Sequence, residues 1–270
     1  MAGGTVLIDA PHQIIAVGDS ITAGSKPGIA EYAPFAEPVS WRLLTTSYPY
    51  VLGELLLENA GPEMILNLGR GGSTTRDWLA GMTWEKDGVK DFPLNGAPLD
   101  EIMASLKSVK ICLMLLGTND ICQSMLPDWI SRLQKGVVGY EDDDFITLRE
   151  NMIVTLMKLK EKGIIVYLAK IPPINYRGGL SFLQADRLLF FTRSAQDKFD
   201  RYTRMVNTRI DEICSSYPEL ARPGPDFYTL FKERDDIWFK DRLHFNDTGY
   251  RLMAEAWADV LKDDGVEVKV

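Results

Sequence analysis

The sequence predicts an α/β protein in which helices cover both faces of a central, mainly parallel sheet of about five strands, forming a three-layer α/β/α sandwich. Four short apolar runs, at residues 14–17, 64–68, 111–116 and 164–169, have the length and residue types of strands buried on both faces. Helical patterns separate these runs. Strands that alternate with helices pair in parallel through right-handed crossovers, so the pattern indicates a doubly wound fold.

Apolar residues at three- and four-residue steps predict the helices. One covers residues 145–159 and ends at Lys162-Gly163, because glycine favours the left-handed conformation at a helix C-terminus. Another follows the start signal Asn246-Asp247-Thr248, since side chains of these types accept hydrogen bonds from the first helical amides. The mixed-charge stretch 184–217 is also expected to be helical and to end before Pro218.

The length of 270 residues suits one large α/β domain. We expect a single domain over residues 1–270, with insertions between core elements near residues 28–50, 82–98 and 121–144, which are rich in proline, glycine and aromatic residues. The acidic run at 141–144 is interpreted as a solvated helix start and not as a metal site, because the helix dipole favours negative charge there.

Charge and composition narrow the class of partners. A net charge of -8 without a basic stripe argues against a nucleic-acid partner, which would require clustered lysine and arginine. No apolar stretch approaches the roughly 20 residues that span a membrane, and the first ten residues do not resemble a signal peptide. Three irregularly spaced cysteines predict neither a disulfide framework nor a metal motif. We therefore expect a cytoplasmic protein without membrane insertion.

Polar groups follow three of the predicted strands, where open parallel sheets bind their ligands. A fourth group precedes the last helix. The four are Gly18-Asp19-Ser20-Ile21-Thr22, Gly69-Arg70-Gly71-Gly72-Ser73-Thr74, Gly117-Thr118-Asn119-Asp120 and Asp241-Arg242-Leu243-His244. Singly, each has a structural explanation: a capped turn, a loop or a surface salt bridge. A nucleotide loop of the G-x-G-x-x-G type is disfavoured, because Thr74 stands where its third glycine belongs.

Together the four groups supply an acyl-transfer apparatus. The hydroxyl of Ser20 is a weak nucleophile until a base takes its proton, and histidine titrates near neutrality. His244 is the expected base, because the other histidine, His12, precedes the first strand and lies at the opposite edge of the sheet. Asp241 can orient the imidazole. Backbone N–H groups of Ser20 and of the glycine loop, with the Asn119 amide, can stabilise an oxyanion.

The sequence resembles the SGNH hydrolases, also called GDSL-type esterases, in the order and spacing of four blocks. These are Gly18-Asp19-Ser20, Asn67 through Gly72, Gly117-Thr118-Asn119-Asp120 and Asp241-Arg242-Leu243-His244. The resemblance spans nearly the whole chain and implies a flavodoxin-like fold, a catalytic triad of Ser20, Asp241 and His244, and no metal or cofactor. It implies an oxyanion hole of Ser20, Gly72 and Asn119, with Gly69 or Gly71 replacing Gly72 if the loop folds differently. Asp19 and Asp120 flank these residues, and we expect them to brace the loops by hydrogen bonds.

The expected activity is hydrolysis of a small soluble carboxylic ester through an acyl-enzyme intermediate. An aromatic-walled pocket would include Trp41, Trp129 and Tyr176, and Arg70 would contact a polar part of the substrate unless it is a surface arginine. The alternatives are a carbohydrate O-acetylesterase, a non-catalytic binding protein with the same fold, and a nucleotide-binding flavodoxin-like protein. Thioesters, lysophospholipids and acyl transfer to another acceptor stay open.

Overall fold

A computed structural model describes residues 6–10, 12–25, 47–56, 65–81, 97–106, 108–125, 145–174, 193–239 and 242–269. Its centre is a five-stranded parallel sheet with the order β3-β2-β4-β5-β6. The strands are β2 (Ile14–Gly18), β3 (Ile65–Asn67), β4 (Ile111–Leu115), β5 (Ile165–Lys170) and β6 (Arg222–Asp226). This order is that of a flavodoxin-like sheet, whose topological switch point here lies between β2 and β4.

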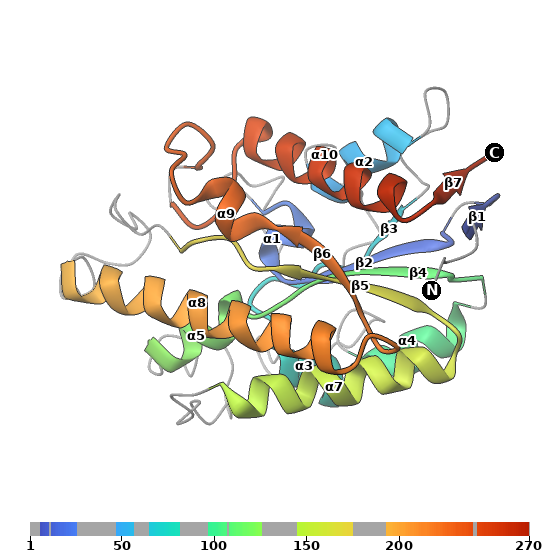
Figure 1. Ribbon diagram of the computed structural model, residues 1–270, viewed down its shortest axis with the longest axis horizontal. Helices are drawn as coiled ribbons and strands as arrows, with labels where there is room; N and C mark the ends of the chain where they lie inside the picture. Colours follow the sequence, from blue (N-terminus) through green and yellow to red (C-terminus); the bar gives the residue numbers. More distant parts are fainter. Residues whose placement is uncertain are drawn as a thin grey trace, which may run out of the picture.

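Helices cover both faces of the sheet, which confirms the three-layer α/β/α sandwich (Figure 1). One layer holds α2 (Tyr48–Leu56) and α10 (Asp247–Asp263), with the short helices α1 (Ser20–Ala23) and α9 (Phe227–Phe231) near the end of the sheet that carries the polar groups. The other layer holds α3 (Thr75–Ala80), α4 (Leu99–Ser105), α5 (Thr118–Met125), α7 (Ile146–Glu161) and α8 (Arg193–Ser216).

The four predicted strands agree with the structure to within one or two residues, because their side chains are buried on both faces of the sheet. Strand β6 was not predicted individually. Its sequence, Arg222-Pro223-Gly224-Pro225-Asp226, lacks the residue types of a strand. Among the described strands it pairs with β5 alone, at the edge of the sheet, where prolines without an N–H group are tolerated.

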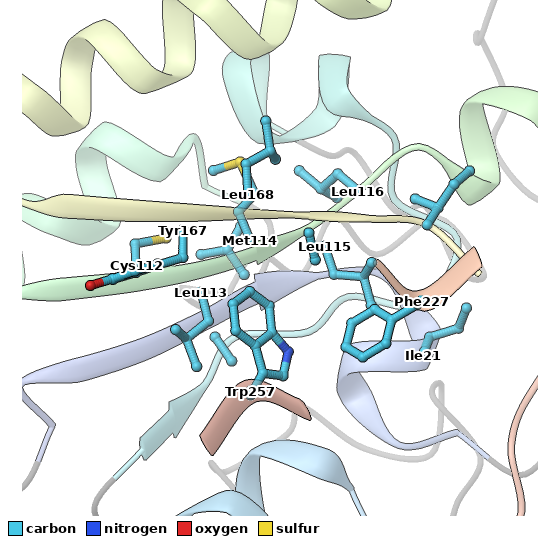
Figure 2. Close-up of a cluster of buried hydrophobic side chains, with 14 of the residues drawn as sticks. Ile21, Cys112, Leu113, Met114, Leu115, Leu116, Tyr167, Leu168, Phe227 and Trp257 are labelled. Atoms are coloured by element: carbon cyan, nitrogen blue, oxygen red, sulfur yellow. The ribbon is translucent and has the colours of Figure 1, made fainter. Parts of the chain in front are cut away.

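The core on the α10 side of the sheet is aromatic (Figure 2). Trp257 of α10 and Phe227 of α9 are fully buried and meet edge to face, with ring centroids 6.1 Å apart. Figure 2 shows both rings on the same side of the sheet as Ile21 of α1, while Leu116 and Leu168 lie on the other side. The helix that carries Ser20 is therefore packed into the hydrophobic core.

Two of the predicted helices are confirmed closely. Helix α7 ends beside Gly163, which has a φ of +73°, and α10 begins after Asn246, whose side chain accepts a hydrogen bond from the Gly249 N–H. Helix α8 accounts for residues 193–216 of the predicted stretch 184–217, and residues 184–192 lie outside the described part.

Two of the expected insertions, 28–50 and 121–144, include residues that belong to helices in the structure. Residues 48–50 belong to α2, and residues 121–125 belong to α5. The 82–98 stretch is described only at residues 97–98, and the acidic run at 141–144 falls outside the described residues.

A second, two-stranded sheet joins the two ends of the described chain. Strand β1 (Val6–Ile8) pairs in parallel with β7 (Val266–Val268). Lys110, which directly precedes β4, donates a hydrogen bond to the Leu7 carbonyl, so this small sheet lies at the amino edge of the main sheet. None of the helices in the described ranges is long and apolar enough to cross a membrane.

Candidate active site

Ser20 lies at the sharp turn between β2 and α1. Asp19 before it is extended, and its Oδ1 accepts a hydrogen bond of 2.8 Å from the Ile21 N–H. Helix α1 ends after one turn at Gly24, whose φ of +79° suits glycine. The cap at one end and the glycine at the other fix the backbone around Ser20 at the carboxyl end of β2.

Helix α1 is fastened by side chains from three other elements. Tyr48 of α2 hydrogen-bonds through its hydroxyl to Thr22 Oγ1 at 3.1 Å. Asn67, at the end of β3, donates to the Thr22 carbonyl at 2.9 Å, and Tyr250 of α10 donates to the Ser25 carbonyl at 3.3 Å. These bonds restrain the position of the Ser20 backbone.

The glycine-rich loop after β3 forms a tight turn. The Ser73 N–H donates to the Arg70 carbonyl at 3.2 Å, and Gly72, at the third position of this turn, has a φ of +76°. Type II turns require a positive φ at that position, which glycine adopts without strain. The Arg70 N–H donates to the Gly18 carbonyl at 3.0 Å, so the turn lies beside the Ser20 loop.

The third group begins α5 and is joined to the glycine loop and to the start of α3. Asn119 is 5% exposed, and its Nδ2 donates to the Ser73 carbonyl at 3.1 Å. Asp120 is fully buried and accepts hydrogen bonds from the Thr75 Oγ1 at 2.7 Å and the Thr75 N–H at 3.2 Å. The carboxylate of Asp120 therefore links α5 to the start of α3.

His244 lies on a narrow hairpin before α10. Trp238 pairs with Phe245 in an antiparallel bridge, and the Phe239 N–H donates to the His244 carbonyl at 2.9 Å. Arg242, near the tip, has a φ of +59°, a conformation that costs a non-glycine residue energy and is common at functional loops. The hairpin holds His244 in a fixed place at the end of the sheet.

The structure brings Ser20 and His244 together. The His244 Nε2 lies 2.8 Å from the Ser20 Oγ, and the imidazole is only 5% exposed. His12 is exposed and precedes β2, at the opposite edge of the sheet. Asp241 lies outside the described residues. In the described part of the chain, no group of three or more His, Cys, Asp or Glu side chains is arranged to hold a metal ion.

The charge state of Asp19 depends on its burial. Loss of solvent contact raises the pKa of the Asp19 carboxyl to about 7. The negative charge of Asp120 adds to this rise, whereas the hydrogen bond from the Ile21 N–H opposes it. The Asp19 Oδ2 is buried and has no hydrogen-bond partner, in agreement with a carboxyl that is costly to ionise.

Residues 14–257, which contain all five strands of the main sheet and all four polar groups, match the family model described as GDSL-like lipase/acylhydrolase. The chain belongs to this family. As a GDSL-like lipase/acylhydrolase, it is a hydrolase that acts on ester bonds, and the resemblance of its motifs to the SGNH hydrolases is confirmed. The sequence matches no curated protein.

Solved structures share the fold of this GDSL-like hydrolase. A lipolytic protein of the G-D-S-L family from Veillonella parvula is 20% identical, with a TM-score of 0.54 over 94% of this chain and 98% of that one. A catalytic mutant of an acetylxylan esterase from Geobacillus stearothermophilus is 17% identical, with a TM-score of 0.54 over 100% of both chains. A psychrotrophic esterase from Pseudoalteromonas is 15% identical, with a TM-score of 0.52 over 93% and 96%.

The interpretation of Arg70 as a surface arginine is wrong, because its side chain is buried. It is 6% exposed, its guanidinium lies 3.8 Å from the centre of the Trp78 ring, and Nη2 donates to the Ala97 carbonyl at 2.6 Å. Burial lowers the pKa of Arg70 to about 10. The other proposed pocket residues, Trp41, Trp129 and Tyr176, lie outside the described residues.

Several residues that shape the site were not singled out in the sequence. The fold brings three such residues from distant parts of the chain into contact with the polar groups: Ser73 with Asn119, Thr75 with Asp120, and Tyr48 with Thr22. One signal was present, because Thr74-Thr75-Arg76-Asp77 has the spacing of a capping box and marks the start of α3. The Thr74 N–H and Oγ1 both donate to Asp77 Oδ2, at 2.8 and 2.7 Å. No local pattern points to Tyr48.

Proposed function

We propose that this GDSL-like hydrolase cleaves a small, soluble carboxylic ester through an acyl-enzyme intermediate on Ser20. His244 is the general base, and Asp241 orients its imidazole. The observation that carries this proposal is the 2.8 Å hydrogen bond between the His244 Nε2 and the Ser20 Oγ, since a serine needs a base within hydrogen-bond reach.

The proposed reaction has two halves. The Ser20 oxygen attacks the ester carbonyl while His244 takes the hydroxyl proton, and the tetrahedral intermediate then expels the alcohol, which receives that proton. The acyl group is left on Ser20. Water, deprotonated by His244, attacks this acyl-serine, and the carboxylic acid leaves as the proton returns to Ser20. Asp241 stays ionised and stabilises the imidazolium formed in each half.

Three donors are proposed for the oxyanion: the backbone N–H groups of Ser20 and Gly72, and the Nδ2 of Asn119. Their support is the hydrogen-bonded contact between the three segments. The Arg70 N–H bonds to the Gly18 carbonyl, and the Asn119 Nδ2 bonds to the Ser73 carbonyl. Donors on rigid, buried segments stabilise developing charge without a reorganisation cost.

A carbohydrate O-acetylester is the second candidate substrate. Structures with this fold include two acetylxylan esterases, the one from Geobacillus stearothermophilus and a second with a TM-score of 0.51. The same residues would remove an acetyl group from a sugar hydroxyl, because only the alcohol half of the ester differs. A panel of p-nitrophenyl esters of increasing acyl length, run against acetylated xylan, separates the two candidates by kcat/KM.

Labelling with a fluorophosphonate tests the nucleophile directly. The reagent phosphonylates only activated serines, so mass spectrometry of the wild type is expected to find the adduct on the peptide that contains Ser20. Ser20→Ala should lose both the adduct and ester hydrolysis while its circular dichroism is unchanged. Ser25→Ala removes a buried hydroxyl that has no partner and should keep both. Substantial hydrolysis by Ser20→Ala would refute the proposal.

A further inference from the structure

Ser73 follows the proposed oxyanion glycine and is completely buried. The single hydrogen of its Oγ is shared between the Arg70 carbonyl at 2.9 Å and the Gly18 carbonyl at 3.2 Å, and the Oγ accepts a hydrogen bond from the Trp78 Nε1 at 3.2 Å. A single hydroxyl therefore joins the end of β2, the glycine loop and helix α3. These contacts fix the backbone of Ser73 relative to Gly18, which lies two positions before Ser20.

The Ser73 carbonyl meets the side-chain amide of Asn119. It accepts a hydrogen bond of 3.1 Å from the Nδ2. A carbonyl attracts the NH₂ end of an amide and repels its oxygen, so this contact decides which way the Asn119 amide faces. The NH₂ group has two hydrogens, and the one not bonded to Ser73 is available to an oxyanion.

We propose that Ser73 is a positioning residue that sets the orientation of the Asn119 amide in the oxyanion hole. The proposal rests on the function proposed above. The Oγ of Ser73 holds the backbone in place, and the backbone carbonyl holds the amide. An oxyanion donor must lie within about 2.7–3.1 Å of the charged oxygen, so a small displacement of the carbonyl weakens stabilisation of the transition state.

Ser73→Ala removes the hydroxyl and leaves the carbonyl. We expect kcat to fall roughly 10- to 100-fold with KM changed less than about twofold, because the orientation matters most in the transition state. Ser73→Cys, which keeps a weaker donor, should have an intermediate kcat and provides a second variant if the alanine variant folds poorly. Thr155→Val removes a buried hydroxyl of α7 that bonds the Asn151 carbonyl, and should leave kcat unchanged.

A double-mutant cycle separates positioning from a general loss of stability. In an Asn119→Ala background, Ser73→Ala should lower kcat no further, because the group that it positions is already gone. Equal effects in both backgrounds would overturn the proposal.

An NMR measurement gives a readout independent of activity. Ser73→Ala should shift the side-chain NH₂ resonances of Asn119, and unchanged resonances would overturn the positioning role even in a protein that hydrolyses no ester. Failure of the proposed function has a different signature, namely a wild type that is not labelled on Ser20.

Discussion

The Nε2 of His244 and the Oγ of Ser20 lie 2.8 Å apart, although 224 positions separate the two residues in the chain. Ser20 depends on the capped turn of α1 and its bonds to α2, β3 and α10, and His244 depends on the hairpin between Trp238 and Phe245. The contact exists because the parallel sheet brings both loops to one edge.

Removal of the imidazole should abolish most of the activity. His244→Ala is expected to lower kcat by at least about a thousandfold, because the Ser20 proton then has no acceptor. His12→Asn is the matched control. His12 is exposed with a φ of +61°, a conformation that asparagine tolerates. Initial rates on p-nitrophenyl acetate measure both, and comparable losses in the two variants would contradict the assignment of His244.

Asn119→Ala should lower kcat about 100- to 1,000-fold, the usual effect of deleting one oxyanion donor. The variant also loses the bond to the Ser73 carbonyl, which contributes about 1 kcal/mol to stability. Steady-state kinetics distinguish a donor from a substrate-binding group. A rise in KM with an unchanged kcat would show that Asn119 binds the ground state and not the transition state.

Asp19 predicts a pH-dependent stability difference. Its pKa is about 7 in the folded protein and near 3.8 when unfolded, so the folded state binds the extra proton between these values. The contribution of Asp19 to the free energy of unfolding therefore falls as the pH rises from about 4 to about 7. Asp19→Asn keeps the acceptor for Ile21 and removes the charge. Its stability relative to wild type should increase over that pH window, by on the order of a few kcal/mol.

Urea unfolding of both proteins at pH 5 and pH 8 (values chosen from the same linkage argument) measures that difference. If the difference between the variant and the wild type is the same at both pH values, Asp19 is ionised throughout, and burial does not raise its pKa as described.

Gly69→Ala should push the glycine loop away from α1. An added Cβ would lie 2.2 Å from the Ala23 backbone nitrogen, closer than atoms can approach. We expect a loss of about 1–3 kcal/mol in stability, together with a lower kcat. Gly163→Ala is the control, because its Cβ meets nothing within 4 Å and only its φ of +73° is strained. Thermal unfolding and kcat should separate the two, since only Gly69→Ala is expected to reduce activity.

The fold and the four polar groups are predictable from the sequence because both depend on local signals. The four predicted strands are mostly apolar, and Asn246 and Gly163 mark helix ends by their own conformational preferences. The signal fails at β6, where two prolines and a glycine form a strand only because β5 offers an edge to pair with. That strand is defined by its partner and not by its own residues.

The contacts behind the site were not predictable in the same way. Asp120 was expected to brace a loop, and its partner Thr75 lies 45 residues away in the chain. Arginine is usually exposed, but the side chain of Arg70 is buried, stacks on Trp78 and donates to the Ala97 carbonyl. Such pairs are created by the crossover of the chain between strands. The sequence therefore indicates which residues carry chemistry, whereas their hydrogen-bonding and packing partners follow only from the fold.

The pairing of β1 with β7 has a practical consequence. Both strands lie at the amino edge of the main sheet, and Figure 1 shows β1 and β7 at the opposite end of the molecule from α1 and α9. A purification tag, a resin or a fused protein attached close to β1 or β7 would lie on the side of the molecule that faces away from α1 and α9. Enzyme tethered in this way presents the rim that carries Ser20 to the surrounding solution, a useful property for immobilised assays of large substrates such as acetylated xylan.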